Sequence, residues 1–255
     1  DHRLAEKYVK AAEQQKQAIP YTVLAAMWMH PDSQRDAEWS HKQMQEQKRQ
    51  PTGEMVVERM KTLQRLGLHK YIIYHLPDQV GTASAAQRAQ LGDILSNAYY
   101  REQYYTRTLQ LGDKGYFSEK YDMPEVRQLY WRARVERKLK RFSALEQTIA
   151  QLERSYPQSS ELDSVLLEVS RYYKGSDRDD LAAIWWNRLL ERFPKNRSGE
   201  IAAWELAWYR YQQKDYQGAL SYINTGLRNG IANPEVSAKF IYWQAKVAIQ
   251  EGKTS

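Results

Sequence analysis

Residues 201–227 read IAAWELAWYRYQQKDYQGALSYINTGL, two segments joined by Lys214 and Asp215. In both segments, aromatic and small apolar residues recur at intervals of three and four, the period of an α-helix with one apolar face. Ala207 and Ala219 stand where two paired helices have to approach closely. This stretch therefore predicts a pair of helices that pack on each other.

The same pattern recurs along the second half of the chain at a nearly constant spacing. A small residue lies inside an aromatic-rich helix in steps of 37, 37 and 38 residues, at Ala133, Ser170, Ala207 and Ala245. The pairs Tyr156-Pro157 and Phe193-Pro194, which close two successive units, are also 37 residues apart. A fixed period of this size is typical of helix-pair solenoids, in which no unit can bury its apolar face alone.

We therefore predict an all-α fold, a tetratricopeptide-like solenoid or superhelix of helix pairs, with roughly twelve helices and no sheet. Residues 123–255 are expected to form about three and a half repeats, continuous with residues 1–122, which form a less regular helical segment. Residues 32–52, between Pro31 and Pro51, are interpreted as an exposed helix or a long connector.

The two ends of the chain complement each other. The tail, Phe240–Gln250, resembles the first helix of a repeat, and residues 1–20 resemble a second helix without its first. An unpaired solenoid helix exposes its apolar stripe, which is unfavourable unless another element covers it. The ends could meet in a closed ring, dock on a partner or another subunit, or belong to a longer superhelix.

Composition limits the kinds of site that this chain can hold. With 42% hydrophobic and 27% charged residues and only 12 Gly and 8 Pro, the sequence suits an ordered helical protein. It has no cysteine, which excludes disulfides and thiolate metal sites. The five histidines lack metal-ligand spacing, and no apolar run approaches the roughly 20 residues of a membrane span.

The sequence also lacks the usual motifs of catalysis and cofactor binding. There is no glycine-rich phosphate loop, no Gly-x-Ser-x-Gly elbow and no His-Glu-x-x-His segment. We therefore expect no catalytic residue, no cofactor and no metal ion, and instead a binding or scaffolding surface.

The net charge of +7 is concentrated in the middle of the chain. Residues 61–141 carry 15 Lys and Arg against 8 Asp and Glu, whereas the segments before and after are balanced. If Trp131, Val135 and Leu139 are buried, the opposite helix face carries the basic side chains Arg134, Arg137, Lys138 and Arg141. This face is either an ordinary solvated surface or a strip that binds an anion.

A run of tyrosines lies in the same basic segment. Residues 99–105 read YYREQYY, in which Tyr100 and Tyr104 are placed one helical turn apart and Arg101 lies between them. Outward tyrosines beside arginines would suit stacking on sugars or bases. The predicted partner surface therefore comprises Tyr100, Arg101, Tyr104, Arg134, Arg137, Lys138 and Arg141. The tryptophan pairs at 185–186 and 204/208 are expected at packing seams.

Several segments resemble known families. Residues 190–196 (LERFPKN) and 208–220 (WYRYQQKDYQGAL) are similar to tetratricopeptide-type repeats of bacterial envelope proteins. Residues 241–246 (IYWQAK) and 21–26 (YTVLAA) are similar to the α-superhelical region of soluble lytic murein transglycosylases, and residues 65–68 and 116–130 resemble the stretch leading into their catalytic domain. The family's catalytic Glu-Ser pair, Gly-Leu-Met-Gln segment and Ala-Tyr-Asn segment do not occur here, so no functional residue is carried over.

The resemblance implies a periplasmic or other cell-envelope location and a ring-shaped superhelix that acts on or near peptidoglycan. The leading hypothesis is a non-catalytic scaffold that binds a protein partner or peptidoglycan. One alternative is the superhelical part of a lytic transglycosylase whose catalytic domain is missing from this chain. A second alternative is an RNA-binding helical repeat, suggested by a pI near 9.3 and by the tyrosine–arginine run, although the repeats show no regular base-reading positions.

Overall fold

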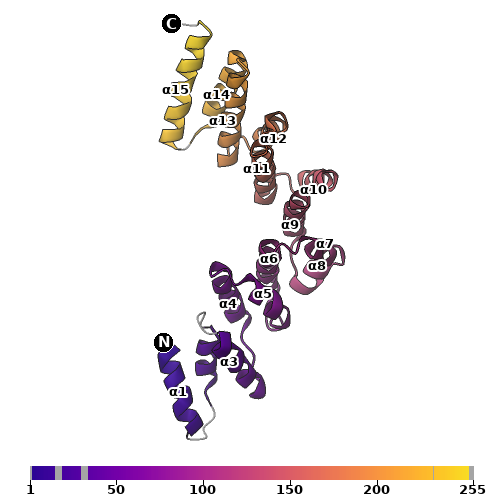
Figure 1. Ribbon diagram of the computed structural model, residues 1–255, viewed down its shortest axis with the longest axis vertical. Helices are drawn as coiled ribbons and strands as arrows, with labels where there is room; N and C mark the ends of the chain where they lie inside the picture. Colours follow the sequence, from indigo (N-terminus) through magenta and orange to yellow (C-terminus); the bar gives the residue numbers. More distant parts are fainter. Residues whose placement is uncertain (1, 15–18, 30–33, 232, 253–255) are drawn as a thin grey trace. The chain divides into compact units, whose positions relative to one another are not determined.

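The computed structural model describes residues 2–14, 19–29, 34–231 and 233–252 (Figure 1). These residues form fifteen α-helices and one 3₁₀ helix, and none of them lies in a β-strand. The helices pack mainly on their neighbours in the chain, which confirms the predicted all-α fold of packed helix pairs. They divide into two compact units, residues 1–135 and residues 136–255.

Unit 1 contains helices of uneven length, from the six residues of α8 to the 17 residues of α6. Its elements are α1 (His2–Gln14), α2 (Tyr21–Met29), α3 (Gln34–Glu46), α4 (Gly53–Arg65), α5 (His69–His75), the 3₁₀ helix η1 (Leu76–Asp78), α6 (Ala85–Arg101), α7 (Tyr105–Asp113), α8 (Tyr116–Tyr121) and most of α9 (Glu125–Lys138). α6 packs on α4, α5, α7 and α8. At the contact with α8, a Cβ atom on Gly92 would lie 2.8 Å from the Cβ of Tyr121, so the close approach requires glycine.

A buried arginine ties α2, α4 and α5 together. Arg59 on α4 is only 2% exposed, and its guanidinium donates to the carbonyl of Trp28 and, at 3.1 Å, to the hydroxyl of Tyr71. The guanidinium carbon lies 4.9 Å from the Trp28 ring centroid and 5.5 Å from that of Tyr71. Because arginine stays charged, these carbonyl, hydroxyl and ring contacts have to offset the cost of burying it.

Two histidines lie close to this buried charge. The ring of His41 lies 6.2 Å from that of Trp28, and the ring of His75 lies 4.0 Å from that of Tyr71. Burial, followed by the positive charge of Arg59, lowers the pKa of His41. Burial also lowers the pKa of His75, against the opposing charge of Glu38. Each charged imidazolium is therefore disfavoured in the folded unit.

Unit 2 is built from helices of similar length, 14 to 17 residues, in a regular order. They are α10 (Phe142–Ser155), α11 (Ser160–Lys174), α12 (Asp179–Arg192), α13 (Arg197–Gln212), α14 (Tyr216–Asn229) and α15 (Pro234–Gln250). From α11 onward, each helix packs tightly on the next in the chain (Figure 1). The loops between them hold three or four residues, so consecutive helices form hairpins.

Contacts between alternate helices arrange unit 2 in two layers. In the first layer, α11 contacts α13 through Asp163 and Asn196, and α13 contacts α15 through Trp204 and Phe240. In the second layer, Arg188 on α12 donates two hydrogen bonds of 2.6 Å to Glu153 on α10. The hydroxyl of Tyr222 on α14 likewise donates to the side chain of Asn187 on α12, at 2.8 Å.

The repeat period is visible as a repeated ion pair. Arg137 pairs with Glu168 at 3.0 Å, and Lys174 pairs with Glu205. Both members of the second pair lie 37 residues after the corresponding members of the first. The 37-residue spacing therefore describes equivalent positions in space.

Small residues lie at the helix contacts, as the sequence predicts. Ser170, Ala207 and Ala219 are buried. Gly226 is buried as well, and a Cβ atom at this position would lie 2.4 Å from the Phe240 ring. Ala245, the fourth position of the series, is exposed, because α14 covers the other side of α15 and no described helix covers this one.

The structure corrects two details of the sequence-based description. It contains more helices than the roughly twelve expected, partly because residues 105–121 form two short helices. Residues 34–46 form a helix that is not simply exposed, since Ala37, Ser40 and Met44 are buried against the rest of unit 1. The division between the two compact units falls after Val135, and the start of the regular repeats at residue 123 stays a prediction. Residues 30–33, which include Pro31, lie outside the described residues.

Replacing Ala207 with Leu should overfill the buried contact and lower the free energy of unfolding by about 1–3 kcal/mol. Ala245→Leu is the matched control, because it adds the same atoms at the equivalent but exposed position and should change stability little. Urea denaturation followed by circular dichroism measures both. Equal effects of the two substitutions would show that the repeat register is wrong.

Unit 1 should lose stability as the pH falls below about 6.5, the ordinary pKa of histidine in an unfolded chain. The folded pKa values of His41 and His75 are lowered, so in this window the unfolded chain binds more protons than the folded unit. The urea midpoint should therefore be lower at about pH 5.5 than at about pH 7.5. The double variant His41→Gln/His75→Gln should show a smaller difference, and an undiminished difference would contradict the assignment.

Candidate functional site: a cavity between two helices of one layer

The predicted partner surface does not form as one exposed face. Tyr99 to Tyr105 is not a continuous helical run, because α6 ends at Arg101, Gln103 has a positive φ of 62° and α7 begins at Tyr105. Tyr100 and Tyr104 therefore lie on either side of a turn. Tyr100 is buried, whereas Tyr104 is 45% exposed, so the prediction that both present their rings to a ligand is wrong for Tyr100.

The arginines predicted to line this surface differ in their surroundings. The guanidinium carbon of Arg134 lies 4.5 Å from the Tyr100 ring centroid and 5.0 Å from that of Trp131. Arg137 pairs with Glu168, and its side chain is only 13% exposed. Of the three arginines predicted to be exposed together, Arg141 is exposed, Arg137 is not, and Arg134 is half-buried against aromatic rings.

The remaining residues of the predicted surface are exposed. Arg101 and Lys138 both reach solvent, as Arg141 does. Arg101 belongs to unit 1, whereas Lys138 and Arg141 belong to unit 2. Within unit 1, the structure brings together Tyr100 and Arg134, which stack on each other.

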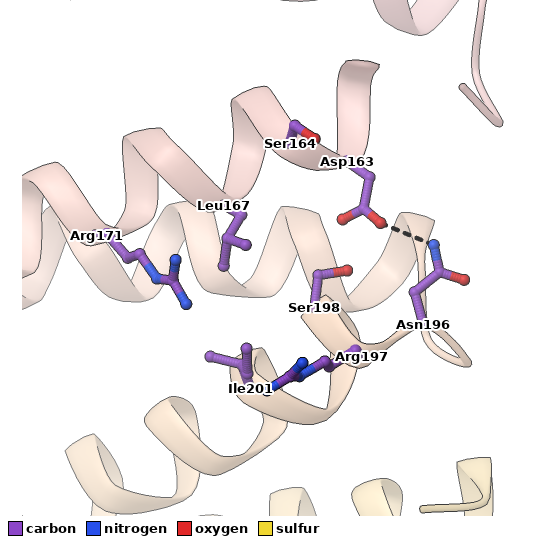
Figure 2. Close-up of a pocket in the computed structure, with 8 residues that line it drawn as sticks. All are labelled: Asp163, Ser164, Leu167, Arg171, Asn196, Arg197, Ser198 and Ile201. Atoms are coloured by element: carbon purple, nitrogen blue, oxygen red, sulfur yellow. Dashed lines mark hydrogen bonds between the residues drawn. The ribbon is translucent and has the colours of Figure 1, made fainter. Parts of the chain in front are cut away.

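A different site is present in unit 2, between α11 and α13. It is a cavity of about 630 Å³ that opens to solvent (Figure 2). This volume is within the range of small-ligand pockets. The α11 side contributes Asp163, Ser164, Leu167 and Arg171, and the α13 side contributes Asn196, Arg197, Ser198 and Ile201. The lining is therefore polar at the helix starts, apolar at Leu167 and Ile201, and basic at two arginines.

The first turns of both helices set the polar end of the cavity. Ser159 caps α11 by accepting from the backbone N–H of Leu162, which leaves the side chain of Asp163 to cross to α13. There, the Nδ2 of Asn196, the residue before α13, donates to the Oδ2 of Asp163 at 2.8 Å. Gly199 packs against the backbone of Phe193 and Pro194, where a Cβ atom would lie 2.1 Å from a carbonyl oxygen. This contact holds the start of α13 in place.

Two buried polar atoms in the cavity have no partner. The Oδ1 of Asp163 and the Oγ of Ser198 are both buried and make no hydrogen bond within the part of the chain that the structure describes. Ser198 is only 6% exposed, and Figure 2 shows its hydroxyl on the side of the cavity where Asp163 and Asn196 lie. Buried polar groups are rarely left unsatisfied, so such a pair indicates a place for a ligand group or an ordered water.

The exposed face of α13 continues beyond the cavity as a row of aromatic side chains. Arg197, Ile201, Trp204, Trp208 and Tyr211 follow each other in steps of four, three, four and three residues, which places them on one helix face. Arg197 is exposed and the other four are half-buried. One face of α13 therefore leads from the polar cavity to a set of half-buried rings.

The aromatic row extends onto α15. The ring of Trp243 lies 5.2 Å from that of Trp208 and 5.4 Å from that of Tyr211, in both cases edge to face. The amine of Lys239 lies 3.3 Å from the Trp204 ring centroid, and burial lowers the pKa of Lys239. The prediction that the tryptophan pairs lie at packing seams is confirmed for Trp185 and Trp186, which are buried. Trp204 and Trp208 also pack at a seam, but they are partly open to solvent.

Sequence reasoning missed every residue of this cavity. Its walls come from two helices that are one repeat apart, and Asp163, Ser164 and Leu167 lie 34 residues before Arg197, Ser198 and Ile201. Aligning the first turns of successive repeats would have placed these side chains opposite each other. A search for charge clusters along the chain could not find them, because the two arginines are 26 residues apart in sequence.

Comparison with known proteins gives no relative: no protein-family model matches the chain, and no similar curated protein is found. Among the described residues, no three His, Asp or Glu side chains gather as metal ligands would. None of the described helices combines the length and apolar character needed to cross a membrane.

Ser198→Ala should not lower the free energy of unfolding, because the buried hydroxyl that it removes bonds to no described residue. Thr148→Val is the contrasting variant, since Thr148 donates to the buried carboxylate of Glu136 at 2.8 Å. Loss of this hydrogen bond should lower the free energy of unfolding by about 1–3 kcal/mol. Urea denaturation of both variants tests this difference, and a cost for Ser198→Ala as large as that for Thr148→Val would show that the hydroxyl serves the fold.

Proposed function

We propose that this chain is a non-catalytic helical-repeat scaffold that binds an extended peptide segment on the layer formed by α11, α13 and α15. The observation that carries the proposal is the single face of α13, which joins the cavity to the aromatic row. Half-buried tryptophans and tyrosines supply large contact areas at low entropic cost, and such rings dominate binding energies in protein interfaces.

The arrangement of this layer suits an elongated ligand. Ile201, Trp204, Trp208 and Tyr211 occupy the length of α13, a helix of 16 residues, which spans about 24 Å. An extended peptide covers that distance with about seven residues. The face begins at the charged Arg197, continues through Ile201 and the rings, and has a second positive group, Lys239 of α15, beside Trp204 at its middle.

The source of the peptide is proposed from the sequence resemblance. Similarity to envelope repeat proteins and to the superhelical region of lytic transglycosylases supports a periplasmic location. Both a protein partner and the peptide stems of peptidoglycan would present extended peptide chains there. RNA is the less favoured ligand, because unit 2 has only a small excess of positive charge, 18 Lys and Arg against 15 Asp and Glu, and several of its basic residues are held in ion pairs.

Trp208→Ala should weaken peptide binding by about tenfold, because it removes a central ring of the row. Binding is measured in two arms, co-sedimentation with purified peptidoglycan and capture by an array of immobilised random peptides. Ile184→Ala is the matched control, since Ile184 is a large apolar residue, 61% exposed, on α12 in the other layer.

The two arms separate peptidoglycan from protein partners as the source of the ligand. Undiminished binding by Trp208→Ala in whichever arm is positive would overturn the proposed face. Absence of binding in both arms, together with salt-sensitive binding to single-stranded RNA, would favour the RNA-binding alternative.

A further inference from the structure

The cavity between α11 and α13 has two positive groups at its mouth. Arg171 on α11 and Arg197 at the start of α13 are both exposed, and Figure 2 shows both guanidiniums directed to the cavity. In the described part of the chain neither forms an ion pair, unlike Arg137 and Arg188. Two like charges that face a common space favour an anion between them, and guanidinium groups bind carboxylates through paired hydrogen bonds.

The polar end of the cavity, by contrast, requires a hydrogen-bond donor and not an anion. The Oδ1 of Asp163 is a buried acceptor without a described partner, since its Oδ2 is the atom that accepts from Asn196. A ligand N–H would satisfy this oxygen, whereas a second negative group would be repelled by it. The hydroxyl of Ser198, which is itself buried and unpartnered, can donate to a ligand oxygen in the same space.

The net charge of the residues that line the cavity indicates which anions fit it. The ionisable side chains that line the cavity are Arg171, Arg197 and Asp163, which give a net charge of +1. A monoanion matches this charge. Phosphate carries more negative charge and presents acceptor oxygens to the Asp163 carboxylate. Leu167 and Ile201 provide an apolar wall between the arginines and the polar end, which suits a short carbon linker.

We propose that this cavity binds a carboxylate that carries an amide N–H a few bonds away, as an acidic residue or the C-terminal residue of a peptide does. Arg171 and Arg197 hold the carboxylate, Asp163 accepts the N–H, and Ser198 donates to a neighbouring carbonyl. The inference rests on the proposed function, since it identifies the residue that anchors a peptide lying along α13.

The test uses small probes and backbone amide NMR signals of the whole chain. N-acetylglycine has a terminal carboxylate and an N–H, and the α-amide of N-acetylaspartic acid has a side-chain carboxylate and an N–H. One or both should shift the amide signals of residues 196–199. N-acetylglycinamide, which lacks the carboxylate, and inorganic phosphate should bind at least about tenfold more weakly. The two carboxylate probes distinguish a terminal from a side-chain anchor.

Variants identify the residues responsible. The double variant Arg171→Gln/Arg197→Gln should lower the affinity for whichever carboxylate probe binds more tightly by about tenfold or more. Asp163→Asn should reduce the affinity for that probe to the affinity for acetate, which has no N–H. Arg192→Gln, which changes an exposed arginine on α12, should bind as the wild type does. Unchanged signals far from the cavity show that each variant is folded.

Three results would overturn the inference: no shift with either carboxylate probe, equal binding of phosphate, or full binding by the double arginine variant. Its failure can be told apart from failure of the proposed function. If Trp208→Ala weakens peptide binding while the double arginine variant binds peptides normally, only the anchor is wrong. If the carboxylate probes bind but Trp208→Ala retains all peptide binding, the aromatic face is wrong and the cavity stands.

Discussion

The arrangement of unit 2 follows from one constraint, that each helix has to be covered by other helices on two sides. A helix of this unit packs on its neighbours in the chain, and it meets the helix two places away through polar and aromatic contacts. The first requirement explains the buried small residues, because Ala207 and Gly226 allow close approach. The second explains the repeated Arg137–Glu168 and Lys174–Glu205 pairs. Together they fix the spacing that the sequence repeats.

The same geometry creates the candidate site. Helices of one layer are held apart by the helix of the other layer that lies between them in the chain, so their facing surfaces are less tightly filled than the contacts within a pair. Between α11 and α13 this space is lined by Asp163, Ser198 and two arginines. Polar groups left unsatisfied inside a well-packed unit lower its stability, and proteins commonly retain such groups where they bind ligands.

The fold was predictable because it follows from local periodicity, whereas the site was not. Intervals of three and four residues identify helices, and a 37-residue period identifies their pairing, without knowledge of any long-range contact. The prediction of an exposed arginine strip failed because the positions of charges along a sequence do not reveal which residues they contact in the fold. Arg137 is held by Glu168, 31 residues away, and Arg134 lies against Tyr100, 34 residues away. The cavity likewise required knowing which first turns face each other.

The two ion pairs have a consequence for how such a chain can change its length. Because Arg137 and Lys174 occupy equivalent positions, as do Glu168 and Glu205, opposite charges meet whichever repeat follows. Excision of one 37-residue module would bring Arg137 opposite Glu205, and duplication of a module would create another matched pair. Recombination between repeats can therefore lengthen or shorten the array while keeping the charges that face each other within a layer complementary.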